Sequence, residues 1–185
     1  MKSTVEFEII FHGPFRVSTG HARSGVDSSV PDTERLPNTS LKGVMRASAK
    51  RLLGEEAAII GEVFGSYRHE SPWRWKSAKP GSSNWPAPQP AARVRIDPNT
   101  HSASENMLAV SEQTWAERAR FSVQSRGHLS EETLRKHRLV LAVTGQAVHS
   151  LGAETRRGLG WVGISCTNVE LDERSVAEFL ELKAA

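Results

Sequence analysis

Apolar side chains occupy alternate positions near the start of the chain. The apolar members are Val5, Phe7, Ile9 and Phe11, and the intervening residues are Thr4, Glu6, Glu8 and Ile10. A two-residue repeat is typical of a strand that is buried on one face. The pattern therefore predicts a first strand over residues 4–11. Gly13-Pro14 ends it, and a polar loop that contains His21 and Arg23 follows.

The spacing changes to that of a helix after Pro37-Asn38. A stripe of positions at helical intervals consists of Leu41, Val44, Met45, Ser48, Leu52 and Leu53. This repeat predicts a helix with one face in the core. Thr39 or Ser40 is expected to cap its start, and Gly54 to end it. The helical region as a whole is expected to end within residues 61–65.

The middle of the chain, residues 66–89, is rich in Pro, Ser and Trp. Its prolines allow one short strand over residues 73–76 and nothing longer. Its three tryptophans are interpreted as core or subunit-interface residues rather than as base-stacking platforms. A polar excursion then runs from Arg93 to about Met107, and alternation at residues 115–124 predicts another strand.

Two further helices and a strand are predicted in the last third. Ser130 is expected to cap a helix whose apolar side is marked by Leu134, Leu141, Val148 and Leu151, with Gly152 closing it. A strand is expected over residues 161–167, and a short acidic helix over 172–182 begins at the cap Asp172. The order strand, helix, strand, strand, helix, strand is the split βαβ pattern of ferredoxin-like and RNA-recognition folds, which are α+β.

Length and composition indicate one soluble domain spanning residues 1–185. The chain is 38% hydrophobic and 24% charged, and no apolar run approaches the roughly 18 residues of a membrane span. No leader precedes the first strand, so a cytoplasmic protein without a membrane partner is expected. The single Cys166 excludes an internal disulfide and is expected to be a small buried apolar group.

The formal net charge of +3 conceals an uneven distribution. The last 17 residues hold five acidic and two basic side chains, whereas the rest hold 22 basic and 16 acidic ones. Residues 35–54 contain five basic side chains and no acidic one, and Lys42, Arg46 and Lys50 follow one another at four-residue intervals. Such a row is either a solvated face with partners elsewhere or a rail for a phosphate backbone.

Several loop residues have chemically useful side chains. Asp27 offers a carboxylate that can ligate a hard cation or orient a hydroxyl, although a lone loop Asp is usually a turn residue. His12 and His21 are acid–base groups by type. The Gly158-Leu-Gly160 segment follows a helix and precedes a strand, so it is no dinucleotide fingerprint. It is either a tight turn or, with Arg156 and Arg157, a phosphate site.

Three segments resemble motifs of the RAMP (repeat-associated mysterious protein) superfamily of CRISPR–Cas proteins. Residues 37–46 (Pro-Asn-Thr-Ser-Leu-Lys-Gly-Val-Met-Arg) resemble the signature that opens its first helix. Residues 93–108 resemble the start of its thumb-like β-hairpin, and residues 151–162 resemble its glycine-rich loop. The resemblance implies an α+β, modified RNA-recognition-motif (ferredoxin-like) domain with a β-hairpin thumb at about residues 97–112 and a glycine-rich loop.

Within the superfamily the chain resembles the repeated backbone subunit of type III effector complexes, in which a loop Asp cuts target RNA. The implied partners are a CRISPR guide RNA, complementary target RNA, other effector subunits and copies of the chain along the guide. The resemblance implies that Asp27 is catalytic with Mg²⁺ or Mn²⁺, and that Asn99, Thr100 and Met107 belong to the thumb. The RNA-binding residues it implies are His21, Arg23, Ser40, Lys42, Arg46, Lys50, Arg156, Arg157, Gly158 and Gly160.

Four interpretations remain open at this level. The chain is either a catalytic backbone subunit or a scaffold subunit in which Asp27 is only structural. Another member of the superfamily, a guide-processing endonuclease, would use His21 as a general base. A stand-alone RNA-binding protein is the fourth interpretation.

Overall fold

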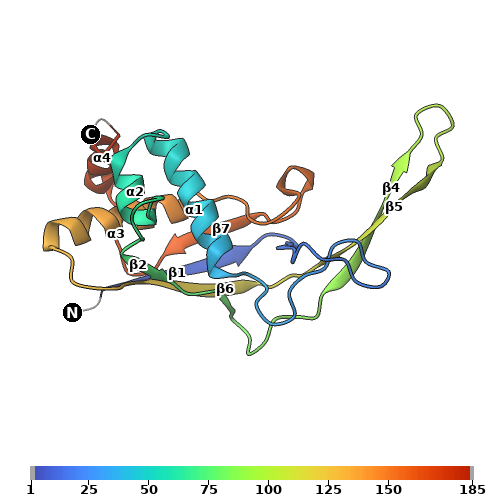
Figure 1. The fold of residues 1–185 in the computed structure, drawn as a ribbon, viewed down its shortest axis with the longest axis horizontal. Coiled ribbons are helices and arrows are strands. Elements are labelled where there is room, and N and C mark those ends of the chain that lie inside the picture. The colour runs from blue at the N-terminus through green and yellow to red at the C-terminus, as the bar shows by residue number, and fades with distance from the viewer. Residues whose placement is uncertain (1–2, 184–185) are drawn as a thin grey trace.

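The computed structural model describes residues 3–183 and contains an antiparallel sheet covered on one face by helices (Figure 1). Its main path has the order β2-β6-β1-β7. These strands span Trp73–Trp75 (β2), Arg118–Ser125 (β6), Thr4–Phe11 (β1) and Val162–Cys166 (β7), and the short β3 (Lys79–Pro80) also pairs with β6. The expected α+β class with an antiparallel sheet is confirmed.

The two helical connections each cross over a neighbouring strand. The chain passes from β1 through α1 (Asn38–Leu53) and α2 (Ala58–Phe64) to β2, and from β6 through α3 (Glu131–Gln146) to β7. A final helix, α4 (Glu173–Glu181), packs against α3. No helix within residues 3–183 combines the length and apolar character needed to cross a bilayer.

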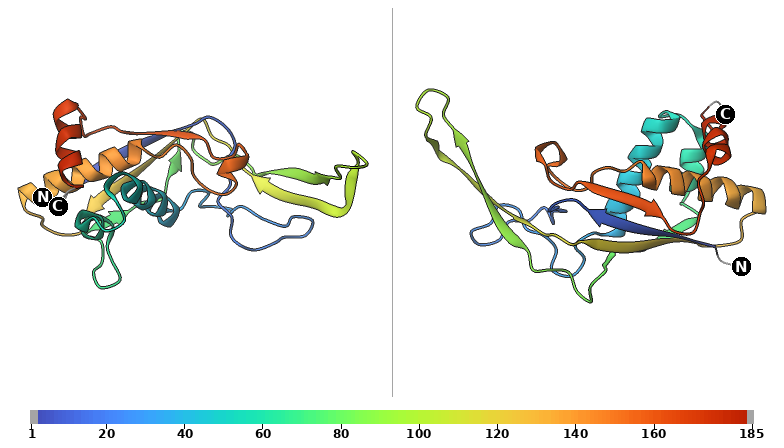
Figure 2. Two further views of the ribbon diagram at one scale, coloured as in Figure 1. Left: turned by 90° about the horizontal axis from the view of Figure 1, so that it is seen from above. Right: turned by 180° about the vertical axis from the view of Figure 1, so that it is seen from behind.

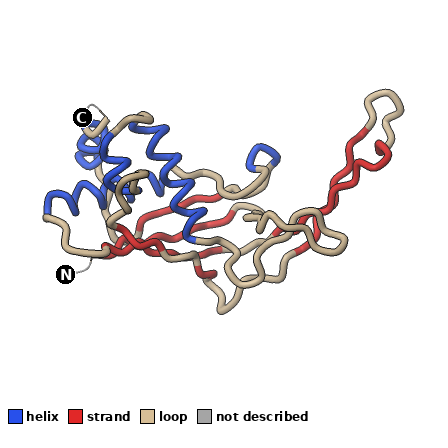
Figure 3. Tube along the Cα trace, viewed as in Figure 1, coloured by secondary structure: helices blue, strands red, loops and turns tan. Residues whose placement is uncertain are grey.

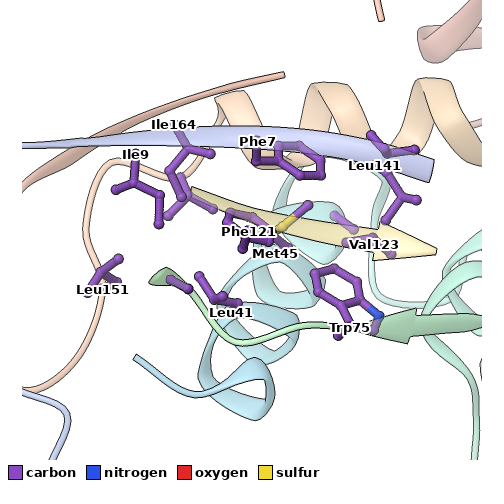
Figure 4. Packing of buried hydrophobic residues seen from close by; sticks show 14 of the residues in the cluster. Phe7, Ile9, Leu41, Met45, Trp75, Phe121, Val123, Leu141, Leu151 and Ile164 are labelled. Atoms are coloured by element: carbon purple, nitrogen blue, oxygen red, sulfur yellow. The ribbon is translucent and has the colours of Figure 1, made fainter. Parts of the chain in front are cut away.

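The core lies between the inner face of the sheet and the helices (Figure 4). Phe7 of β1 stacks on Phe121 of β6 with ring centroids 4.7 Å apart. Met45 from α1, Leu141 from α3 and Trp75 from β2 are buried in the same cluster. The predicted strand alternation and helix stripe are thereby confirmed, as is the burial of the tryptophans of β2. Cys166 is only half-buried, contrary to expectation.

The start of α1 is capped differently from the prediction. Neither Thr39 nor Ser40 caps the helix, because the helix already begins at Asn38. Its N-cap residue is Pro37, which forms no side-chain cap. Instead the backbone N–H of Asn38 donates to Ser77 Oγ at 2.9 Å. A segment 39 residues away therefore satisfies one of the free N–H groups of the first turn.

The end of α3 was also predicted wrongly. The helix ends at Gln146 rather than at Gly152, while Val148 and Leu151 are still buried. Ser150 forms an isolated antiparallel bridge with Trp161, so this stretch packs as an extended edge of the sheet. Apolar spacing alone does not distinguish a longer helix from a helix followed by an extended segment, because both bury the same side chains. The caps Ser130 and Asp172, by contrast, both accept backbone N–H groups as predicted.

A long β-hairpin projects away from the sheet (Figures 1 and 2). It consists of β4 (Gln89–Ile96) and β5 (Ala103–Gln113), so it is longer than the expected segment 97–112. Asp97 Oδ1 shapes the tip by accepting the N–H groups of Asn99 and Thr100, at 2.7 and 3.0 Å. The register shifts beyond the Val94–Leu108 pair, which places Met107 in the irregular part of the hairpin. Figure 3 shows that the polar loop between β1 and α1 runs toward the base of this hairpin.

Candidate nucleic-acid interface

Asp27 is fixed at the base of the hairpin. Its backbone N–H donates to the carbonyl of Val110 on β5, and the N–H of Val110 donates to Asp27 Oδ2, both at 2.8 Å. Glu112 of the same strand accepts the N–H of Val30 at 2.9 Å. These bonds hold an exposed carboxylate in one position. Oδ1 accepts no hydrogen bond from residues 3–183, which leaves one oxygen directed at external groups.

Residues 3–183 do not build a metal site around Asp27 by themselves. Hard divalent cations take six or more oxygen ligands. Within the part of the chain that the structure describes, no three His, Cys, Asp or Glu side chains gather where they could hold a metal ion. Asp27 could thus contribute one oxygen, and the remaining ligands of an Mg²⁺ or Mn²⁺ ion would have to come from RNA and water.

The two other candidates in this loop, His21 and Arg23, differ in availability. His21 is exposed, and its backbone carbonyl accepts a hydrogen bond from Ser29 Oγ at 2.8 Å. Arg23 donates two hydrogen bonds to the carboxylate of Asp32, at 3.0 and 2.7 Å. This pairing raises the pKa of Arg23 and lowers the pKa of Asp32. The carboxylate of Asp32 thus offsets much of the charge that Arg23 could offer to a phosphate.

The five basic residues between positions 35 and 54 divide into two groups. Arg35 is buried and donates to the carbonyl of Pro31, Lys50 pairs with Glu55, and Arg51 donates to the carbonyl of Ala147 at 2.8 Å. Each of these three side chains already has a partner within the chain. The remaining members of the group are Lys42 and Arg46.

Lys42 and Arg46 form the free basic face of α1. Neither takes part in an ion pair among residues 3–183. Partial burial lowers the pKa of Lys42, and the positive charges of Arg46 and Arg126 lower it further. Ser40 lies two residues before Lys42, in the first turn of the helix. An anion beside Lys42 and Arg46 would relieve the repulsion between them.

The loop between α3 and β7 is tied to the hairpin by an ion-pair cluster. Glu154, which has a φ of +58°, pairs with buried Arg16 at 2.8 Å and with Arg93 of β4. The guanidinium of Arg93 has the largest effect in lowering the pKa of Glu154, and the guanidinium of Arg16 lowers it further. Residues Thr155–Arg157 then form a 3₁₀ turn in which Arg156 and Arg157 are exposed. Glu154 therefore fixes this arginine-bearing turn against the base of the hairpin.

The two glycines that were predicted as RNA contacts have different surroundings. Gly160 has a φ of +72°, and a Cβ placed there would lie 1.9 Å from the carbonyl oxygen of Leu151. Gly158 has a φ of +87°, but a Cβ there would meet nothing within 4 Å. Gly160 is thus required by packing, whereas Gly158 leaves open space beside Arg157.

The structure brings some of the predicted residues together and leaves others apart. The loop between β1 and α1, the hairpin and the arginine-bearing turn lie at the same end of the sheet (Figures 1 and 2). Asp27 of this loop is bonded to Val110 of the hairpin. The hairpin tip with Asn99 and Thr100 projects beyond them. No hydrogen bond or ion pair among residues 3–183 links Lys42 or Arg46 to Asp27. Sequence reasoning missed the Arg93–Glu154 pair, because nothing local indicates that residues 61 positions apart meet.

These features define an α+β domain with a projecting hairpin, a loop carboxylate at its base and two separate groups of exposed basic side chains. The chain belongs to the RAMP superfamily, which matches residues 8–163. No curated protein matches the chain in sequence.

Two solved structures share the fold. A chain of the type III-B Cmr-beta complex bound to cognate target RNA has a TM-score of 0.60 and 15% identity, with 91% of this chain and 60% of that chain covered. A chain of type III-B Cmr-beta in the apo state has a TM-score of 0.66 and 13% identity, with 89% and 97% covered. This chain thus spans about 60% of the length of the first relative and nearly all of the second.

Proposed function

We propose that this chain is an RNA-binding backbone subunit of a type III CRISPR effector complex, repeated along a guide RNA. Membership of the RAMP superfamily and the likeness to chains of Cmr-beta complexes support this proposal. The observation that carries it is the basic face of α1, where Lys42 and Arg46 have no ion-pair partner within residues 3–183. Two cations on one helix face without ion-pair partners are suited to phosphates.

The other parts of the molecule receive roles in the same scheme. Arg156 and Arg157 would hold a second stretch of the guide backbone. The hairpin carries exposed apolar residues at Val94, Ile96, Met107 and Leu108, which suit a wedge that separates base steps without reading them. The strand order β2-β6-β1-β7 supports the interpretation as a modified ferredoxin-like domain with the α3–β7 turn as its glycine-rich loop.

Asp27 is the proposed catalytic group for cleavage of complementary target RNA. Its support is the fixed position of the carboxylate at the base of the hairpin, where the proposed wedge would distort the target strand. The carboxylate would orient a ribose hydroxyl for in-line attack or contribute one oxygen to a cation shared with RNA. In the scaffold alternative the same carboxylate only holds Val110. His21 as a general base has less support, because no residue among 3–183 is bonded to its imidazole.

The RNA that accompanies the purified chain tests the proposed function. We expect sequencing of that RNA to return repeat-derived CRISPR guides, and other effector subunits to co-purify with the chain. This result is expected because the proposed subunit binds guide RNA through its phosphates within a complex of defined composition. A mixture of unrelated cellular RNAs would favour the stand-alone RNA-binding protein instead.

The basic face of α1 makes a second prediction. Replacing Lys42 or Arg46 with Ala should weaken RNA binding equally across sequences, since phosphate contacts carry no base information. Each change should lower the slope of log affinity against log salt by about 0.7 to 0.9. Fluorescence anisotropy at several salt concentrations measures both effects. Lys136→Ala, which removes a cation paired with Glu132 on α3, is the control that should leave the slope unchanged.

A further inference from the structure

A groove lies beside the arginine-bearing turn and shares Arg156 with it. It has a volume of about 570 Å³ and is lined by His12, His149, Ser150, Thr155, Arg156 and Trp161. Pockets of this size accommodate small organic groups. Apart from Trp161 and Val162, the side chains that line it are polar or ionisable.

Trp161 is exposed although its backbone is held firmly. Its side chain is 60% exposed. Its carbonyl accepts the N–H of His12 at 2.9 Å, and the residue also bridges to Ser150 on the other side. The neighbouring Gly160 donates its N–H to the carbonyl of Pro14 at 2.8 Å. Because segments on both sides fix the main chain through these hydrogen bonds, the indole is exposed at a defined position and not on a flexible segment.

We infer that Trp161 is a stacking platform for one nucleobase of single-stranded RNA, with Arg156 placed for the adjacent phosphate. An indole ring stacks on any base, and a nearby guanidinium meets the backbone that joins it to the next nucleotide. The imidazoles of His12 and His149 supply hydrogen-bonding groups at the edge of the groove. This inference rests on the proposed RNA-binding function and names a base-contacting site within it.

The surroundings of Trp161 favour a nucleotide over a protein partner. An aromatic anchor in a protein interface normally sits at the centre of a water-excluding, densely packed patch. Around Trp161 the groove instead offers two imidazoles, two hydroxyls and a guanidinium, while Val162 is buried beneath it. Such a mixture of one π-face with cationic and hydrogen-bonding groups matches a base and its phosphate.

Binding of single-stranded oligoadenylate to the intact chain tests the inference. We expect Trp161→Ala to weaken binding about 5- to 150-fold, the equivalent of one lost base stack. Trp161→Phe should keep most of the affinity because it keeps a π-face. The salt slope should not change in either variant, since no charge is removed. An abasic oligonucleotide of equal length should bind the wild type and Trp161→Ala with equal affinity.

Trp115→Ala is the matched control, because Trp115 is 54% exposed but lies outside the groove, between β5 and β6. It should bind oligoadenylate as the wild type does. Unchanged affinity in Trp161→Ala, with weakened binding in Lys42→Ala and Arg46→Ala, would overturn the stacking site and leave the proposed function intact. Unchanged affinity in all three variants would contradict both. An equal loss on the abasic chain would also overturn the stacking role.

Discussion

Replacing Asp27 with Asn is expected to stop cleavage of complementary target RNA by the assembled complex. Asn keeps the size of the side chain, and its carbonyl oxygen can still accept the N–H of Val110. The change removes the negative charge that would orient a hydroxyl or attract a cation. We expect the cleavage rate in Mg²⁺ or Mn²⁺ to fall at least about 100-fold. Guide content, assembly and target affinity should remain within a few-fold of the wild type, measured by gel shift and RNA cleavage assays.

Asp32→Asn is the control for this experiment. Asp32 is also an exposed carboxylate of the loop between β1 and α1, but it pairs with Arg23 instead of standing at the base of the hairpin. Its loss should leave cleavage unchanged. A wild-type complex that binds complementary RNA and leaves it whole in both metals would contradict a catalytic role for Asp27. That result would favour the scaffold alternative.

Gly160→Ala is expected to destabilise the chain strongly. A Cβ at this position would lie 1.9 Å from the carbonyl oxygen of Leu151, and the φ of +72° is unfavourable for any residue with a Cβ. The clash is with a backbone atom, so only a shift of the main chain can relieve it. Such a shift would disturb the hydrogen bond from the N–H of Leu151 to the carbonyl of Gly160. We expect a loss of about 3 to 5 kcal/mol of unfolding free energy and a melting temperature lower by roughly 10 °C or more.

Gly158→Ala separates this packing effect from backbone strain. Gly158 has a similar φ of +87°, but a Cβ there has nothing within 4 Å. Its substitution should cost only about 1–2 kcal/mol, the strain of a left-handed residue. Thermal unfolding of the two variants measures the difference. Equal destabilisation would mean that the close approach at Gly160 is relieved without cost.

Local patterns in the sequence were sufficient for most of the regular structure. Alternation predicted β1, the helical stripe predicted the buried face of α1, and the caps Ser130 and Asp172 were identified because capping is a contact between near neighbours. The resemblance to the RAMP superfamily was also visible in the sequence, and the match over residues 8–163 confirmed it. Each of these signals is carried by residues within a few positions of one another.

Only the tertiary structure decided which of several chemically similar residues are free and which are engaged. Lys42 and Lys50 look alike in the sequence, but Lys50 has Glu55 as its partner and Lys42 does not. Gly158 and Gly160 differ only in what lies across the loop from them. Ser77 caps α1 because the chain between them folds back through α2 and β2. Contacts of this kind join residues far apart in the sequence, so no local pattern records them and only the packing of the whole chain determines them.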